Sequence, residues 1–405
     1  MPGAPPEGEP VPADGALPGS ALPGIGTRPF GFYVHVPFCA TRCGYCDFNT
    51  YTANELGGGA RDSYPDLAIS EIRLARRVLG DAELEVRSVF FGGGTPTLLA
   101  PSRLAAILRA IDGEFGLASG AEVTTEANPE SVDERSLAEL RQAGFTRISF
   151  GMQSAVPHVL ATLDRVHTPE RAVRCAAWAR AAGFGQVSLD LIYGTPGESD
   201  ADWIRSVEAA LSAQPDHISA YALIVEDGTR LAAQIKRGRL PEPDDDAMAD
   251  RYLAAEDVLS SAGLSWYEIS NWAADDAARC EHNLLYWTGG DWWGIGPGAH
   301  SHVGGTRWWN VRHPRSYAAR LAAAESPGQA REVLTRLERR TEQIMLLTRL
   351  ATGCPADVLT ARGQAAARAA VGDGLVTAAG WASGRVVLTR AGRLLADAVI
   401  RDLTE

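Results

Sequence analysis

The sequence lacks a long apolar run and an excess of positive charge. No stretch reaches the ~18 consecutive apolar residues that a membrane-spanning helix needs. The formal net charge is −12, which disfavours nucleic acid as the main partner because phosphate contacts need a basic surface. The N-terminus has neither the basic nor the apolar segment of a secretion signal. We therefore expect a cytoplasmic protein whose thiols stay reduced.

Cysteine is also scarce, but it is concentrated. Of six cysteines, three fall within eight residues of the stretch VPFCATRCGYCDF, as Cys39, Cys43 and Cys46. No second cysteine pair follows, as a closed four-ligand zinc site would require. Thiolates suit iron–sulfur clusters, and three of them can bind three irons of a [4Fe–4S] cluster while the fourth iron stays open. The sequence therefore predicts a cluster with one open position.

The first 29 residues are rich in proline and poor in large apolar side chains. They hold eight prolines, a composition that predicts a disordered leader over 1–29. Three further segments are expected. These are a barrel over 30–226, a linker and aromatic-rich region over 227–330, and a C-terminal helical module over 331–405.

Apolar, β-branched runs alternate with helical patterns between residues 31 and 223. The predicted strands are Gly31–Phe38, Val86–Phe91, Ala121–Glu126, Arg147–Phe150, Val187–Ile192 and His217–Leu223. The predicted helices are Tyr64–Leu79, Ser102–Phe115, Glu134–Gln142, Pro169–Ala182 and Asp200–Ala213. This alternation is typical of an α/β fold with parallel strands and right-handed crossovers. Six such units predict an incomplete TIM-type (β/α)6 barrel.

The pattern changes after residue 226. The region 266–309 holds seven of the ten tryptophans. Residues Arg331–Leu350 predict a long amphipathic helix. The tail, 354–405, predicts a small α/β extension that resembles a winged-helix module and serves as a packing domain.

Candidate ligand-binding residues follow the predicted strands. Functional residues of TIM-type barrels gather at the carboxyl ends of the strands. The run Gly92–Thr97 follows the second strand, and its glycines let backbone amides approach a ligand closely. Glu126, Gln153 and Asp190 lie at later strand ends, and Arg165 lies in a loop beyond one. Each of them alone is more often a structural residue, whereas their convergence on one rim favours a binding site.

The motif CxxxCxxC directly after the first strand resembles the radical S-adenosylmethionine superfamily. The resemblance implies that the amino and carboxylate groups of S-adenosylmethionine chelate the open iron. It also implies that the cofactor is contacted by Tyr33, Gly93, Gly94, Thr95, Glu126, Gln153, Arg165, Asp190 and Ala222. Carboxylates accept hydrogen bonds from ribose hydroxyls or an ammonium group, and an arginine pairs with a carboxylate.

Over about residues 30–400 the chain resembles the oxygen-independent coproporphyrinogen III oxidase family, which also contains heme chaperones. The oxidases carry a fourth cysteine two residues after the third, where this chain has Phe48. They also have a longer structured N-terminal extension. The segment His282–Trp287 resembles the HNxxYW motif of the chaperones. These differences favour a heme chaperone that hands heme to an acceptor protein. The protein then lacks coproporphyrinogen III dehydrogenase activity.

The same resemblance implies that His282 binds heme, since imidazole is a common axial ligand of heme iron. Cys280 is a second candidate ligand. We expect aromatic side chains to cover the macrocycle, from Tyr286, Trp287, Trp292 and Trp293. We expect the segment Gly294–Ser301 to shape the cofactor pocket.

Two alternatives stay open. One is oxidative decarboxylation of coproporphyrinogen III in porphyrin biosynthesis, and the other is a radical S-adenosylmethionine enzyme acting on an unrelated substrate. In each case an electron donor such as a flavodoxin or ferredoxin is the expected partner.

Overall fold

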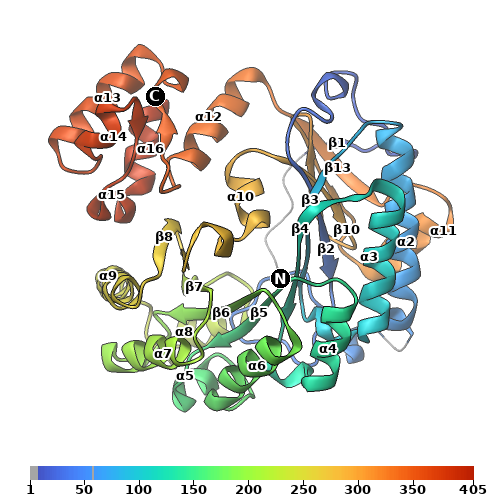
Figure 1. Cartoon of the computed structure of the whole chain (residues 1–405), viewed down its shortest axis with the longest axis horizontal. Coiled ribbons are helices and arrows are strands. Elements are labelled where there is room, and N and C mark those ends of the chain that lie inside the picture. Colours follow the sequence, from blue (N-terminus) through green and yellow to red (C-terminus); the bar gives the residue numbers. More distant parts are fainter. Residues whose placement is uncertain (1–7, 57–58) are drawn as a thin grey trace.

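The six predicted parallel strands are present in the structure, a computed structural model that describes residues 8–56 and 59–405 (Figure 1). They are β2 (Phe30–Val36), β3 (Val86–Gly93), β4 (Leu117–Ala127), β5 (Arg147–Gln153), β6 (Gln186–Tyr193) and β7 (His217–Ala222). The predicted helices are confirmed within a few residues as α2 (Ala60–Leu79), α3 (Pro101–Phe115), α4 (Glu134–Gln142), α6 (Pro169–Ala182) and α7 (Asp200–Ser212).

A seventh strand, β10 (Asp291–Ile295), pairs in parallel with β2 and comes from the aromatic-rich region. Within the described residues the strand order is β1-β13-β12-β11-β10-β2-β3-β4-β5-β6-β7-β9-β8. The other strands are β1 (Glu9–Pro10), β8 (Ser265–Glu268), β9 (Asn271–Ala273), β11 (His300–Val303), β12 (Thr306–Asn310) and β13 (Gly328–Val333). The two end strands, β1 and β8, do not pair with each other in the part described, so the barrel is incomplete.

The parallel strands bury apolar side chains on one face and carry polar ones on the other. On β5, Ile148, Phe150 and Met152 are fully buried in the main hydrophobic core, whereas Arg147 and Ser149 line a cavity. This alternation follows from the period of two along a strand. Figure 1 shows α2, α3, α4, α6 and α7 on the outer, convex side and α10 (Glu281–Trp287) on the inner side.

The predicted disorder of the leader is wrong for residues 8–29. Strand β1 pairs with β13, and Ala21 is fully buried. The edge of β13 offers unpaired backbone groups to the leader, and Val11, Leu17 and Ile25 pack against the main core. Residues 1–7 lie outside the described residues.

The predicted helix Arg331–Leu350 is shorter than expected. Residues 331–333 belong to β13, where they pair with β12 and, through Arg331, with β1. The helix α12 is Arg336–Leu347, and it begins after a capping box formed by Thr335 and Glu338. The capping pair satisfies the free N–H groups of the first turn and so fixes where the helix starts.

The C-terminal residues form a small module with a hydrophobic core of its own. After α12 it contains β14 (Cys354–Pro355), α13 (Ala361–Gly372), α14 (Ala378–Ala382), β15 (Arg385–Val386), α15 (Arg390–Leu394) and α16 (Ala396–Thr404). Arg390 and Arg393 join the module to α9 (Asp245–Ser261) through Asp257 and Glu256. The other α-helices are α1 (Ala53–Leu56), α5 (Pro157–Thr162), α8 (Arg230–Lys236) and α11 (Pro314–Ala322). No described helix is both long enough and apolar enough to span a membrane.

Candidate functional site

A cavity of about 610 Å³ opens on the polar face of the parallel sheet. Its walls come from strands β2 to β7, from the loop after β2 and from α10. Every residue predicted to bind the cluster, the cofactor or heme lines it: Tyr33, Cys39, Cys43, Cys46, Gly93, Gly94, Thr95, Glu126, Gln153, Arg165, Asp190, Ala222 and His282. Residues far apart in the sequence therefore share one chamber.

The three clustered cysteines lie in the loop after β2 and are partly exposed to this cavity. Burial is the main cause that raises the pKa of the Cys46 thiol to about 11, and the neighbouring thiols raise it further. Among the described residues, no three His, Cys, Asp or Glu side chains lie close enough to hold one metal ion. The three thiols nevertheless line one cavity, as the ligands of a single iron–sulfur cluster would.

The cysteine loop is held by residues that the sequence analysis missed. The backbone carbonyl of Asn49 lies 3.0 Å from Nε2 of His35 on β2. The side-chain amide of Asn49 donates, through Nδ2, to the carbonyl oxygens of Pro297 and Arg312, each over 2.9 Å. His35 also lies 3.0 Å from the Tyr33 hydroxyl. The position directly after CxxCDF therefore anchors the loop to two distant segments, a role that no spacing rule reveals.

The glycine run after β3 has a steric reason for its composition. Gly93 has a φ of +108°, and a Cβ there would lie 2.6 Å from the His35 ring. A Cβ on Gly94 would lie 2.5 Å from the carbonyl oxygen of Phe38. Only glycine allows the backbone to pass this close to the cysteine loop. The Gly93 N–H donates to Glu126 Oε2 over 3.0 Å.

Two half-buried carboxyl groups, Glu126 and Asp190, line the cavity and form no ion pair among the described residues, although the Arg165 charge acts to lower the pKa of Asp190. Burial raises the pKa of Glu126 to about 8, with a further contribution from Asp190. Burial also raises the pKa of Asp190 to about 6, although Ser149 donates to it over 2.9 Å. Such a pair favours a positively charged ligand, because a cation would stabilise both ionised forms. The sulfonium and ammonium groups of S-adenosylmethionine fit this requirement.

Arg165 and Gln153 lie beside the cysteines and the carboxyl pair. The Arg165 Nη1 lies 3.5 Å from Cys43 Sγ, and Nη2 donates to the Gly151 carbonyl over 2.7 Å. Its buried Nε has no hydrogen-bond partner among the described residues. Gln153 has a φ of +64°, a conformation that non-glycine residues adopt mainly at strained or functional positions. Both features are expected where a ligand completes the site.

His282 lies inside the cavity, but both of its ring nitrogens are already engaged. Nδ1 lies 2.9 Å from the Ser88 hydroxyl, and Nε2 lies 2.7 Å from the Tyr286 hydroxyl. The ring stacks on Phe90, and burial lowers the pKa of His282 to about 3. The imidazole is therefore neutral, as a metal ligand must be. One hydrogen bond has to be released before it can bind iron.

Of the aromatic residues expected to cover heme, only Tyr286 is among the described residues that line the cavity. Trp287 donates to buried Glu268, Trp292 donates to the His300 carbonyl, and Trp293 packs edge-on against Trp308. The expectation for these three was wrong, because their side chains make these other contacts and do not belong to the described cavity lining.

The segment Gly294–Ser301 was also expected to shape the pocket. It does not reach the cavity in the described structure. It supports the site from behind, because Gly294 pairs with Tyr33 in the sheet and the Pro297 carbonyl accepts from Asn49.

The sequence analysis also missed the polar residues at the end of the cavity that lies away from the cysteines. They are Thr124, Arg147, Ser149, Ser188, His217 and Ser219. Cys280 lines the same end, and its thiol donates to Glu122 over 3.5 Å. The signal was available, since the polar residues recur at every second position of β4 to β7. On strands buried on both faces, such alternation indicates a polar lumen.

Comparison with known proteins places the chain in a family. Residues 33–210 match the Radical SAM superfamily. "Heme chaperone HemW" of Mycobacterium tuberculosis is 53% identical over 388 residues, which cover 96% of this chain and 97% of the relative. The chain belongs to the HemW family of the radical SAM superfamily.

Other relatives agree with this assignment. "Heme chaperone HemW" of Escherichia coli is 35% identical, over 71% of this chain and 75% of the relative. The structure also resembles the coproporphyrinogen III oxidase HemN of Escherichia coli, with a TM-score of 0.80 and 22% identity over 95% of this chain and 92% of that one. The last match shows a shared fold.

Proposed function

We propose that the protein is a cytoplasmic heme chaperone that binds a [4Fe–4S] cluster, S-adenosylmethionine and heme, and passes heme to an acceptor protein. The observation that carries this proposal is the 53% identity, over nearly the whole of both chains, to a relative with that name. Phe48 supports it, because the oxidase motif has a cysteine at this position and Phe48 lines the cavity here.

In this proposal Cys39, Cys43 and Cys46 hold the cluster. When bound, the cluster supplies an electron to the sulfonium of S-adenosylmethionine, from a donor such as a flavodoxin or ferredoxin. Glu126 and Asp190 attract the positively charged groups of that cofactor, and Glu126, whose pKa is about 8, loses its proton when the cation binds.

The other predicted cofactor residues position the ligand. Arg165 pairs with the methionine carboxylate, since its Nε lacks a partner and its Nη1 already lies beside Cys43. Gly93 and Gly94 let the backbone approach closely, together with Tyr33, Thr95, Gln153 and Ala222 on the same walls. His282 is the proposed axial ligand of heme, after its bond with Tyr286 is released.

The test is anaerobic reconstitution followed by two assays on one preparation. Heme titration should give a Soret band with saturable binding. Incubation with coproporphyrinogen III, S-adenosylmethionine and a reductant should give no protoporphyrinogen IX. Formation of protoporphyrinogen IX would replace the chaperone with the oxidase, and absence of a saturable Soret band would remove heme from the proposal.

A further inference from the structure

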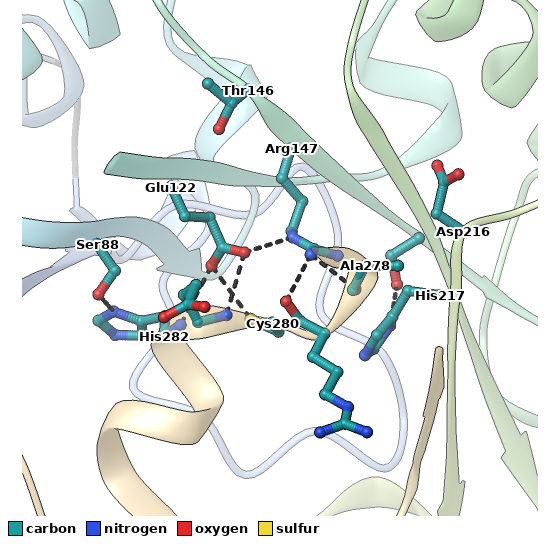
Figure 2. Close-up of polar contacts among 12 residues, drawn as sticks. Ser88, Glu122, Thr146, Arg147, Asp216, His217, Ala278, Cys280 and His282 are labelled. Carbon is teal, nitrogen blue, oxygen red and sulfur yellow. Dashed lines mark hydrogen bonds and ion pairs between the residues drawn. The ribbon is translucent and has the colours of Figure 1, made fainter. Parts of the chain in front are cut away.

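The end of the cavity away from the cysteines holds a buried arginine with a free nitrogen (Figure 2). Arg147 is 2% exposed, and its Nε donates to Glu122 over 2.8 Å. Its Nη2 donates to the carbonyl oxygens of Ala278 and Arg279. The remaining nitrogen, Nη1, is buried and has no partner among the described residues. A buried donor without an acceptor destabilises the fold, so a ligand that supplies an oxygen would be bound favourably.

A second unpartnered donor stands beside the first. Thr124 on β4 is the register partner of Arg147 on β5, and both side chains line the cavity. Thr124 is 1% exposed, and its hydroxyl also has no partner in the described chain. A guanidinium group is only a donor, and a hydroxyl can donate as well. Two adjacent donors on one wall call for an acceptor, and a carboxylate matches a guanidinium best.

The acidic groups near Arg147 do not fully balance its positive charge, so an anion can bind beside it. Glu122 accepts hydrogen bonds from Cys280 Sγ and from the backbone N–H groups of Glu281 and His282, besides Arg147 (Figure 2). Because four donors share its charge, Glu122 neutralises Arg147 only in part.

The acids that line the cavity are Asp47, Glu126, Asp190 and Glu226. The raised pKa of Glu126, about 8, keeps that carboxyl group largely protonated at neutral pH until a cation binds, whereas Asp190, with a pKa of about 6, is largely ionised. Glu126 therefore opposes an added carboxylate less than an ionised group would.

The position of Arg147 indicates which carboxylate it receives. Arg147 begins β5 and Gly151 lies four residues further along it, which corresponds to about 13 Å at ~3.3 Å per residue. Arg165 contacts Gly151 and Cys43, so the cysteines mark that other end. A methionine carboxylate held there does not reach Arg147. His282, in contrast, shares Glu122 with Arg147 through its backbone N–H.

We propose that Arg147 and Thr124 form a carboxylate-binding subsite, and that it holds a propionate of heme beside His282. The assignment to heme rests on the proposed chaperone function. The carboxylate subsite itself rests only on the two unpartnered donors.

The test compares heme with heme dimethyl ester, in which both propionates are esterified. Each is titrated into wild-type protein and into the Thr124→Val and Arg147→Lys variants. Thr124→Val should weaken heme binding about fivefold and Arg147→Lys about 10- to 100-fold, as expected for hydrogen bonds to a charged group. Binding of the ester should be the same in all three proteins. Thr124→Val leaves the Arg147–Glu122 pair intact, so it tests the subsite even if Arg147→Lys does not fold.

Matched controls are Thr125→Val, a buried threonine outside the described cavity lining, and Arg251→Lys, a largely buried arginine paired with Glu198 and Asp200. Both should bind heme like wild type. S-adenosylmethionine is titrated into the same proteins. If its affinity falls in Thr124→Val while heme binding is unchanged, the carboxylate belongs to methionine and the heme assignment is wrong. If neither affinity changes, the two donors are satisfied by water only and the subsite is wrong. If wild-type protein binds no heme, the chaperone proposal itself fails.

Discussion

The two ends of the cavity differ in how far the chain satisfies its own polar groups. At the end marked by the cysteines, Glu126 and Asp190 form no ion pair among the described residues, and Arg165 has an unpartnered nitrogen. At the other end, Glu122 is paired with Arg147 and both nitrogens of His282 are bonded, whereas Arg147 Nη1 and the Thr124 hydroxyl lack a partner in the described chain. Buried polar groups without partners destabilise a fold unless a ligand completes them.

This difference separates binding groups from structural ones. At the cysteine end the unpaired charged groups indicate a site where a charged cofactor supplies the missing partners. Changes there should therefore lower ligand affinity more than stability. At the Arg147 end most polar groups are paired within the chain, so changes there, apart from those at the two unpartnered donors, should lower stability first. Each prediction below tests one side of this contrast.

The largest effect is expected at the cysteines. Cys39→Ala, Cys43→Ala and Cys46→Ala should each abolish the cluster on anaerobic reconstitution, because three protein ligands leave none to spare. Iron and sulfide content and the visible absorbance measure this. The control is Cys175→Ala, a thiol buried in α6 away from the cavity, which should load normally. A normal cluster in any of the three single variants would refute the three-thiolate site.

Removal of Glu122 should mainly destabilise the fold. Glu122→Ala leaves the Arg147 charge buried without its partner, and we expect a loss of about 3–5 kcal/mol in the free energy of unfolding. Urea denaturation measures it. Glu139→Ala breaks an exposed ion pair with Arg135 on α4 and should cost less than about 1 kcal/mol. Equal losses in the two variants would show that the Arg147 end is not the internally paired structural unit described above.

Glu126→Gln should have the opposite effect, lowering the affinity for S-adenosylmethionine more than the free energy of unfolding. It removes a carboxylate that has no cation in the ligand-free protein, so stability should be little changed. Affinity for S-adenosylmethionine should fall about 10- to 100-fold, because a charged hydrogen-bond partner is lost. Isothermal titration and urea denaturation on the same samples separate the two effects. A large loss of stability with unchanged affinity would contradict the assignment.

The raised pKa of Glu126 also predicts that the affinity for S-adenosylmethionine depends on pH. The pKa of Glu126 is about 8 in the ligand-free protein. Below that pH the group is protonated, and a cationic ligand must displace the proton. Affinity for S-adenosylmethionine should therefore rise with pH up to about 8 and then level off, by at most about tenfold per pH unit for one released proton. Glu126→Gln should flatten this part of the profile, and a wild-type affinity that is constant between pH 6 and 8 would be inconsistent with it.

Much of this arrangement follows from local sequence signals. The six strands and five helices were predictable because alternating runs and helical periods are local patterns. The cavity residues on β4 to β6 were found from strand ends. In contrast, β10 was missed because its pairing with β2 joins segments about 260 residues apart.

The missed site residues depended on similar long-range contacts. Asn49 acts through the carbonyls of Pro297 and Arg312, and Glu122 acts through the backbone of α10. Neither role is visible until the chain is folded. The positions of the tryptophans were predicted wrongly for a local reason. A sequence motif identifies the residues, but it does not indicate on which face of α10 or β10 each side chain lies.

The smallest effect is expected at Tyr286, and it tests whether His282 binds heme iron through Nε2. The Tyr286 hydroxyl lies 2.7 Å from Nε2, the nitrogen nearest to it, and competes with any metal for that atom. Tyr286→Phe removes the competing bond and keeps the ring that packs against His282. If His282 ligates heme through Nε2, heme affinity should rise about fivefold, since a neutral hydrogen bond contributes about 1 kcal/mol. His282→Ala should instead weaken binding and shift the Soret band. If Tyr286→Phe and His282→Ala both bind heme as wild type does, His282 is a structural residue of the Arg147 end, and the iron takes another ligand.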